Sequence, residues 1–307
     1  MIVSSATTGA AWFLDGLASI QARQLKTERE LSSGYKIQDA SDSPGQTPAL
    51  VRFTGSLSNA QTWRTNLDTI ASEAQTADQS ISSAIDAINS AKTLAAQGAT
   101  STSTAAIRQN LALQVQALQQ QIVSSANATF DGRYIFGGDQ DQSAPYALNP
   151  SSATGVDQLT AQASTRIIDN PTGQPVYQSL SASQIFDQRA ADGTPAGTNA
   201  FAALQNLSTA LTNNDVAGIT SSLDSLGQVG DWLNQQQAYY GREGNRIEVE
   251  QQTTDNNILS LQTQISGIRD TDVAQAATDL TQEATAQQAA LSAEAQIPRK
   301  SLFDYLG

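Results

Sequence analysis

A long hydrophobic repeat in the last third of the chain constrains the fold more than any other feature. Mostly apolar positions recur in alternating steps of four and three over residues 219–268, without a skip. This average period of 3.5 residues is typical of a helix that packs against other helices. One helix cannot bury such a stripe against itself. The repeat therefore predicts a long helix, beyond ordinary globular length, with helical partners.

The placement of proline indicates where those partners lie. A proline inside a helix removes a hydrogen bond and costs about 3 kcal/mol. The eight prolines leave two long proline-free tracts, residues 49–144 and 196–297, which we predict to be the helical body. Heptad spacing predicts helices from Phe13 to a stop at Gly34, from Phe53 onward, and from a cap at Thr104.

The segment between the helical tracts has a different pattern. Turn pairs such as Asp-Gly, Gly-Gly and Asn-Pro separate short β-prone runs at residues 133–136, 165–168 and 176–177. We therefore predict a mainly α fold: an elongated antiparallel helical bundle or coiled coil formed by the N- and C-terminal regions, with a small β-rich insertion domain in the middle. The expected domains are a terminal assembly domain (1–48 and 269–307), a helical rod (49–130 and 199–268) and the insertion (131–198).

Composition argues against catalysis. The chain of 307 residues has no histidine and no cysteine, so the commonest general base, the thiolate nucleophile and the usual transition-metal ligands are missing. We expect no enzyme, no catalytic residue, no cofactor and no metal. The net charge of −13 disfavours nucleic acid and anionic lipid as partners. No apolar run is long enough for a membrane span, and no ordinary signal peptide is expected.

Three short motifs with possible chemistry are better explained as structure. Gly137-Gly138 lacks the Lys-Ser/Thr sequel of a phosphate-binding loop, and residues 139–141 lack the glycine and glutamate of a calcium loop. Both are predicted to be turns. Asp270 and Asp272 beside Arg269 are predicted to form salt bridges on a helix surface or between subunits.

Two sets of apolar residues are the candidate functional positions. The predicted rod core is Trp63, Leu67, Ile70, Ile81, Ile88, Leu111, Leu118, Ile122, Leu233, Tyr240, Ile247, Ile258, Leu261, Ile265 and Ile268. Periodicity alone would suit a bundle within one chain. However, the stripes at the two ends are too thin to stabilise a helix in a lone molecule and favour packing between chains. The predicted assembly interface is Phe13, Leu17, Ile20, Leu31, Val273, Leu280, Leu291, Leu302, Phe303, Tyr305 and Leu306.

Both ends of the chain resemble the flagellin family. The similarity lies in residues 30–37 and 40–44 near the start, then in residues 244–247, 268–274, 280–281 and 298–306 in the same order. Ser43 departs from the family pattern, which usually has a second acid at that position. Residues 126–138 resemble the branch of the family that joins hook to filament better than they resemble filament subunits. The filament subunit remains the alternative.

The resemblance implies a structural role rather than a reaction. It implies terminal helices that fold on assembly, a helical rod and an outward-facing insertion, in a subunit that joins hook to filament by self-assembly. It also implies an extracellular location on the bacterial flagellum after export by the flagellar secretion apparatus without a cleaved signal. The implied partners are other axial proteins (hook-associated proteins and flagellin), copies of the chain and an export chaperone. From the residues alone, a cytoplasmic coiled-coil scaffold or, less readily, a carboxylate-based surface glycosidase would remain.

Overall fold

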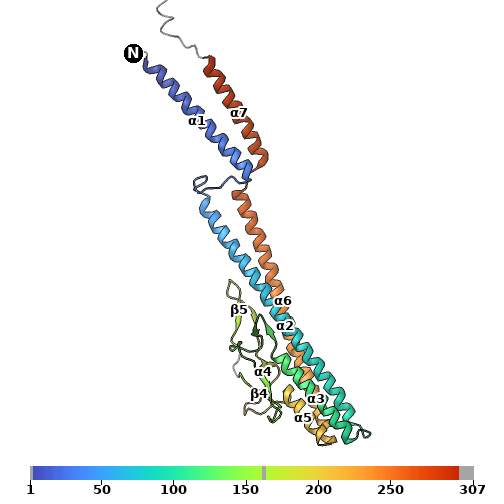
Figure 1. Ribbon diagram of the computed structural model, residues 1–307. Coiled ribbons are helices and arrows are strands. Elements are labelled where there is room, and N and C mark those ends of the chain that lie inside the picture. Colours follow the sequence, from blue (N-terminus) through green and yellow to red (C-terminus); the bar gives the residue numbers. More distant parts are fainter. Residues whose placement is uncertain (1–2, 161–163, 297–307) are drawn as a thin grey trace, which may run out of the picture. The chain divides into compact units, whose positions relative to one another are not determined.

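The computed structural model describes residues 3–160 and 164–296 of the chain (Figure 1). The chain divides into two compact units. We call residues 1–61 with 256–307 the terminal unit and residues 62–255 the central unit. The helices are α1 (Val3–Ser33), α2 (Thr47–Ala99), α3 (Ala105–Ala126), α4 (Ala182–Ile185), α5 (Ala200–Thr212), α6 (Val216–Arg269) and α7 (Val273–Gln296).

The predicted mainly α fold, with β structure confined to the middle of the chain, is confirmed. The heptad repeat lies on α6, a single helix of 54 residues. Each of the fifteen repeat positions from Ile219 to Ile268 is buried or half-buried, including the polar Gln237, Gln251 and Thr254. The repeat therefore marks the packed side of the helix even where its residues are not apolar. No helix within the described residues has the length and apolar character to cross a bilayer.

Local capping chemistry sets the helix ends where the sequence predicts them. Gly34, with a φ of +76°, ends α1 in a left-handed conformation that a side chain would disfavour. Thr104 caps α3, because its side chain accepts a hydrogen bond from the Ile107 amide. An unpredicted residue closes α2. The buried Arg108 donates to the carbonyl oxygens of Gly98 (2.8 Å) and Thr100 (3.1 Å), which the end of the helix would otherwise leave unpaired.

The insertion contains three two-stranded antiparallel sheets. Their strands are β1 (Thr129–Phe130) with β2 (Arg133–Tyr134), β3 (Tyr146–Leu148) with β4 (Val156–Gln158), and β5 (Ile167–Asp169) with β6 (Pro175–Gln178). The predicted β-prone runs overlap β2, β5 and β6. The predicted turn at Gly137 and Gly138 follows β2, and Gly138 has a φ of +62°. β1, β3, β4 and the one-turn helix α4 were not predicted.

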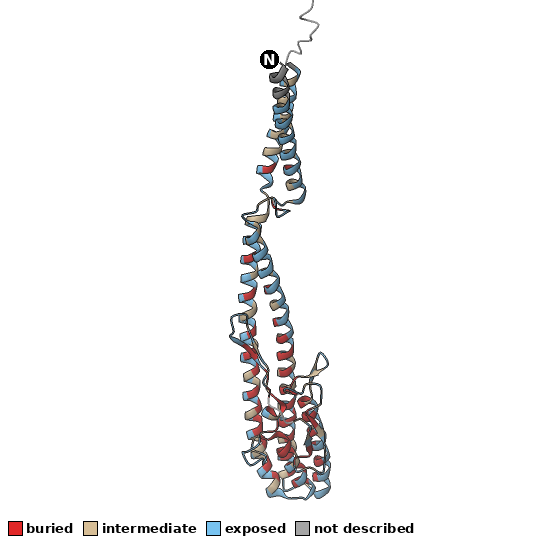
Figure 2. Ribbon diagram, turned by 90° about the vertical axis from the view of Figure 1, so that its left-hand side faces the viewer, coloured by how far each residue is buried: buried red, intermediate tan, exposed pale blue. Residues whose placement is uncertain are grey.

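The core of the central unit lies where the insertion meets the helices. Buried residues gather around α3, α5 and the adjoining parts of α2 and α6 (Figure 2). The Phe136 ring meets the Phe186 ring edge-on at 5.7 Å, and the Tyr146 and Phe201 rings lie 4.8 Å apart. The buried Asp187 carboxylate accepts hydrogen bonds from Tyr146 Oη (3.0 Å) and Asn199 Nδ2 (2.6 Å). Because these polar groups are paired, burying them carries no large penalty.

The predicted rod-core residues lie on the packed sides of three helices, α2, α3 and α6. Those that are buried are Leu67, Ile70, Ile81, Ile88, Leu111, Ile122, Leu233, Tyr240, Ile247, Leu261 and Ile265. Trp63, Leu118, Ile258 and Ile268 are half-buried. The last four positions of α6 in this set, from Ile258 onward, belong to the terminal unit.

Candidate assembly surface on the terminal helices

Two segments more than 230 positions apart in the sequence form the joint of the terminal unit. The Thr271 amide donates to the carbonyl oxygen of Gly34 (2.9 Å), and the Lys36 amide donates to the carbonyl oxygen of Arg269 (2.8 Å). A β-bridge pairs Tyr35 with Asp270. Two of the motifs singled out in the sequence, one from each end of the chain, are therefore the two halves of one joint.

Side chains reinforce this joint. The Arg269 guanidinium lies 4.0 Å from the centre of the Tyr35 ring, a cation–π contact. The Asp270 carboxylate accepts hydrogen bonds from Ser266 Oγ (2.6 Å) and Arg269 Nε (3.2 Å). These bonds, the one from Ser266 foremost, lower the pKa of Asp270 because they stabilise its charged form.

Asp272 has a different role from its neighbour. It accepts hydrogen bonds from the amides of Ala274 (3.0 Å) and Gln275 (3.1 Å), and so caps the start of α7. The predicted salt bridge is thus present for Asp270 with Arg269, whereas Asp272 forms a helix cap. The slip of the hydrophobic register after Ile268 corresponds to the break between α6 and α7.

Beyond the joint, α1 and α7 run side by side in opposite directions (Figure 1). The side of α1 that packs on α7 carries Phe13, Leu17, Ile20 and Leu31, all half-buried. On α7 the packed side carries Ala276, which is buried, and Leu280, which is half-buried. Polar residues continue that side, and the Glu283 Oε2 atom is buried without a hydrogen-bond partner among the described residues. The two helices therefore cover each other only in part, since polar residues interrupt the packed sides of both.

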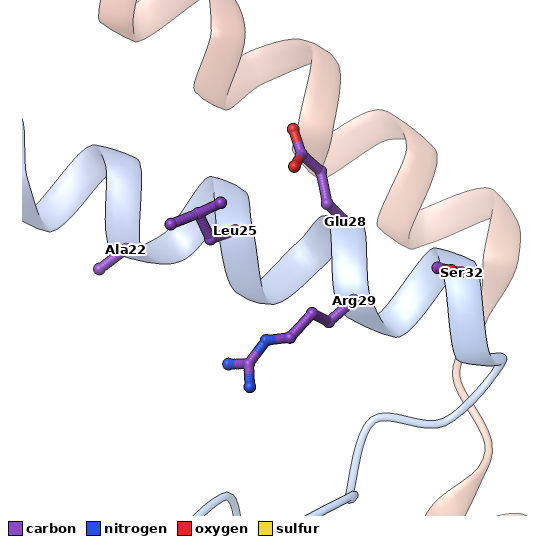
Figure 3. Close-up of a pocket in the computed structure, with 5 residues that line it drawn as sticks. All are labelled: Ala22, Leu25, Glu28, Arg29 and Ser32. Atoms are coloured by element: carbon purple, nitrogen blue, oxygen red, sulfur yellow. The ribbon is translucent and has the colours of Figure 1, made fainter.

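A second apolar stripe on α1 remains uncovered. We call it the outer stripe of α1, and its members are Ala11, Leu14, Ala18, Ala22, Leu25 and Ser32, all exposed. Leu14 and Leu25 expose 63% and 61% of their surface. A shallow hollow of about 620 Å³ lies at its C-terminal end, lined by Ala22, Leu25, Glu28, Arg29 and Ser32. In Figure 3, Arg29 extends from α1 into open space. The sequence did not predict this stripe, because only one packed face was expected on each helix.

An uncovered stripe also runs along α7. We call it the outer stripe of α7, and its members are Val273, Ala277, Ala284, Leu291 and Ala295. Val273 and Leu291, both predicted interface residues, expose 59% and 50% of their surface. Leu302, Phe303, Tyr305 and Leu306, the other predicted interface residues at this end, lie outside the described residues.

The chemistry of this surface suits helix packing. Over residues 3–160 and 164–296 no group of three or more acidic side chains is arranged to hold a metal ion. The two outer stripes contain aliphatic and small side chains and Ser32, and none of their members is charged. Exposed apolar helix faces of this kind are characteristic of protein–protein contact surfaces.

Comparison with known families agrees with the resemblance seen at the two ends. Residues 7–141 match the family model described as the bacterial flagellin N-terminal helical region. Residues 223–306 match the model of the bacterial flagellin C-terminal helical region. The unmatched stretch between them contains most of the β-rich insertion.

Two curated relatives carry the same name. The chain is 27% identical over 202 residues to flagellar hook-associated protein 3 of Escherichia coli (strain K12), a match over 64% of this chain and 62% of that protein. It is 26% identical over 205 residues to the Salmonella typhimurium protein of that name, over 64% and 63%. The chain thus spans somewhat less than two thirds of the length of these relatives.

Solved structures show a similar fold. A flagellar hook-associated protein from Vibrio parahaemolyticus matches with a TM-score of 0.65 at 16% identity, over 75% of this chain and all of that one. A flagellar junction protein from Legionella pneumophila matches with a TM-score of 0.56 at 13% identity, over 73% and 99%. At such low identity the likeness concerns the fold alone.

Proposed function

The chain belongs to the flagellin family, and from that premise we propose that it is a structural subunit of the bacterial flagellum that joins the hook to the filament. The observation that carries the proposal is the terminal unit. Its helices α1 and α7, which come from opposite ends of the chain, cover each other in part and leave two apolar stripes exposed. A subunit that completes its packing against neighbours has this form.

The hook–filament junction is favoured over the filament itself by two observations. The curated relatives are named as hook-associated proteins. The distinguishing residues 126–138 also form a tight structural element at the end of α3 and in the β1–β2 hairpin. A Cβ at Gly137 would lie 3.0 Å from the Asp141 Cα atom and from the Gln140 carbonyl oxygen. A side chain at position 137 would therefore be crowded, and the packing of this segment favours glycine there.

The proposal includes the partners and the location. The partners are other axial proteins, namely hook-associated proteins and flagellin, together with copies of the chain and an export chaperone. The subunit acts outside the cell, after export through the flagellar secretion apparatus without a cleaved signal. Residues 131–198 form its outward-facing domain, residues 49–130 and 199–268 its rod, and residues 1–48 and 269–307 its assembly domain. No step of this role requires catalysis.

A gene deletion in the source bacterium tests the proposal. The expected deletion strain makes hooks, sheds unpolymerised filament subunits into the medium and regains filaments when the gene is restored. Electron microscopy of the cells and gel analysis of the medium give the readout. A strain with complete hooks that keep their junction proteins but lack filament would contradict the junction role and identify a filament subunit instead.

A further inference from the structure

We propose that the outer stripe of α1 binds the outer stripe of α7 from a neighbouring copy of the chain, antiparallel and in one defined register. This inference deepens the proposed function and rests on it. It names the occupant of the hollow beside Leu25, which the terminal unit leaves open in a single chain.

The first argument is spacing. Four of the six residues in the outer stripe of α1, Leu14, Ala18, Leu25 and Ser32, are spaced by four, seven and seven positions. In the opposite direction along α7, four of the five residues of its outer stripe, Ala295, Leu291, Ala284 and Ala277, have the same spacing. Equal steps on two helices keep every pair of positions in contact along the whole stripe.

The second argument is size. In this register each leucine meets an alanine: Leu14 meets Ala295, Leu291 meets Ala18, and Leu25 meets Ala284. Alternation of large and small residues lets side chains interdigitate, whereas leucine opposite leucine would hold the helices apart. A shift by one heptad in one direction sets Leu25 against Leu291. A shift in the other direction sets Leu14 against Gln288 and leaves Ala18 opposite Ala284, two small residues.

The third argument is charge, which disfavours the packing of α7 on α7 between copies. Within its printed bounds α7 carries three acidic residues, Asp279, Glu283 and Glu294, and no basic residue. In α1 three basic residues, Arg23, Lys26 and Arg29, balance three acidic ones. Packing α7 on α7 between copies would bring like charges together, whereas packing α7 on α1 does not. This matters in a chain with a net charge of −13.

The inference is tested by disulfide cross-linking, for which a chain without cysteine is well suited. Cells that lack the native gene express two copies with tags of different size, one carrying Leu25→Cys and the other Ala284→Cys. Flagella are sheared off and oxidised, and the linked dimers are separated by mass. We expect the mixed dimer in at least ~10-fold excess over the one-heptad mismatch of Leu25→Cys with Leu291→Cys, because a disulfide needs Cα atoms within about 7 Å. Ala18→Cys with Leu291→Cys is the second matched pair and is expected to link as well.

Two cross-linking results would overturn the inference: joined flagella without the mixed dimer, or equal yields from matched and mismatched pairs. In both cases the proposed function would stand, because the flagella are intact. If a strain without this gene makes normal flagella, the proposed function fails, and the inference fails with it.

A size exchange gives an independent measurement should the cysteine variants not assemble. Leu25→Ala is expected to lower the number of filaments per cell, and Leu25→Ala with Ala284→Leu is expected to restore it. Leu25→Ala with Ala289→Leu, a change at an exposed position off the stripe, is the control and should not restore it. Unchanged filament numbers with Leu25→Ala, or equal restoration by both second changes, would refute the register.

Discussion

One buried carboxylate on α2 links the β-rich insertion to the helices of the central unit. Glu73 on α2 is 2% exposed and binds the Arg166 guanidinium through two hydrogen bonds of 2.8 Å. The Tyr177 hydroxyl donates to the same carboxylate at 3.3 Å. A buried carboxylate with two partners fixes the positions of both partner side chains. Loss of Glu73 or of Arg166 would leave the charge of the other without its partner.

Glu73→Ala is therefore expected to lower the free energy of unfolding of the central unit by about 2 kcal/mol, less than the loss of a fully buried pair because Arg166 is partly exposed. Chemical denaturation followed by circular dichroism measures this value. Asp68→Ala is the matched control, since its ion pair with Arg64 lies on the surface of the same helix and contributes about 0.5 kcal/mol. Equal losses of unfolding free energy in the two variants would show that the buried pair stabilises the central unit no more than the surface pair does.

Asp270 makes the joint of the terminal unit sensitive to acid. Its pKa lies below the ordinary value of 3.8, chiefly through the hydrogen bond from Ser266. A carboxyl whose pKa is lower in the folded state stabilises the fold above its unfolded pKa, and that contribution is lost as the pH falls through the folded value. The protection of residues 34–37 and 269–271 from hydrogen exchange, relative to an unfolded chain at the same pH, is expected to fall below about pH 3.8. Asp270→Asn should remove this pH dependence, and an undiminished dependence in the variant would assign it to another group.

At the scale of the elements, the caps decide where helices begin and end. Thr104→Ala removes the acceptor for the Ile107 amide and is expected to destabilise the central unit by about 1 kcal/mol. Thr93→Ala, an exposed change inside α2, is the control and should be close to neutral. Thermal unfolding of both variants measures the difference. A neutral Thr104→Ala would mean that water satisfies the first turn of α3 equally well.

The sequence predicts elements of this chain well where a period runs long enough. The repeat on α6, the stop at Gly34 and the cap at Thr104 are all local signals, and each is found in the structure. The missed features depend on partners far apart in the sequence. Glu73 and Arg166 are 93 positions apart. From the sequence, Arg108 would be taken for a surface residue, because its contact with the end of α2 is visible only in the structure. The outer stripe of α1 was missed for another reason, since its alanines are also ordinary residues for an exposed helix surface.

At the scale of the whole molecule, the two units differ in how much they bury. The large buried side chains, among them Phe136, Phe186 and Phe201, lie in the central unit, whereas α1 and α7 are mostly exposed or half-buried (Figure 2). Brief digestion of the purified chain with an unspecific protease is therefore expected to trim the terminal helices first and to leave a resistant core close to residues 62–255. Mass spectrometry identifies the fragments. A terminal unit that survives as long as the core would contradict the partial covering of α1 and α7.

The joint between Gly34 and Thr271 also affects when the terminal unit folds. Residues 62–255 are continuous in the chain and can fold as soon as they have been made, but the Gly34 carbonyl oxygen has no partner until Thr271 follows it, 237 positions later. Contacts between positions so far apart in the sequence form slowly. They form last when the chain emerges with its N-terminus first. The packing of α1 against α7 is thus completed last, after the central unit has folded.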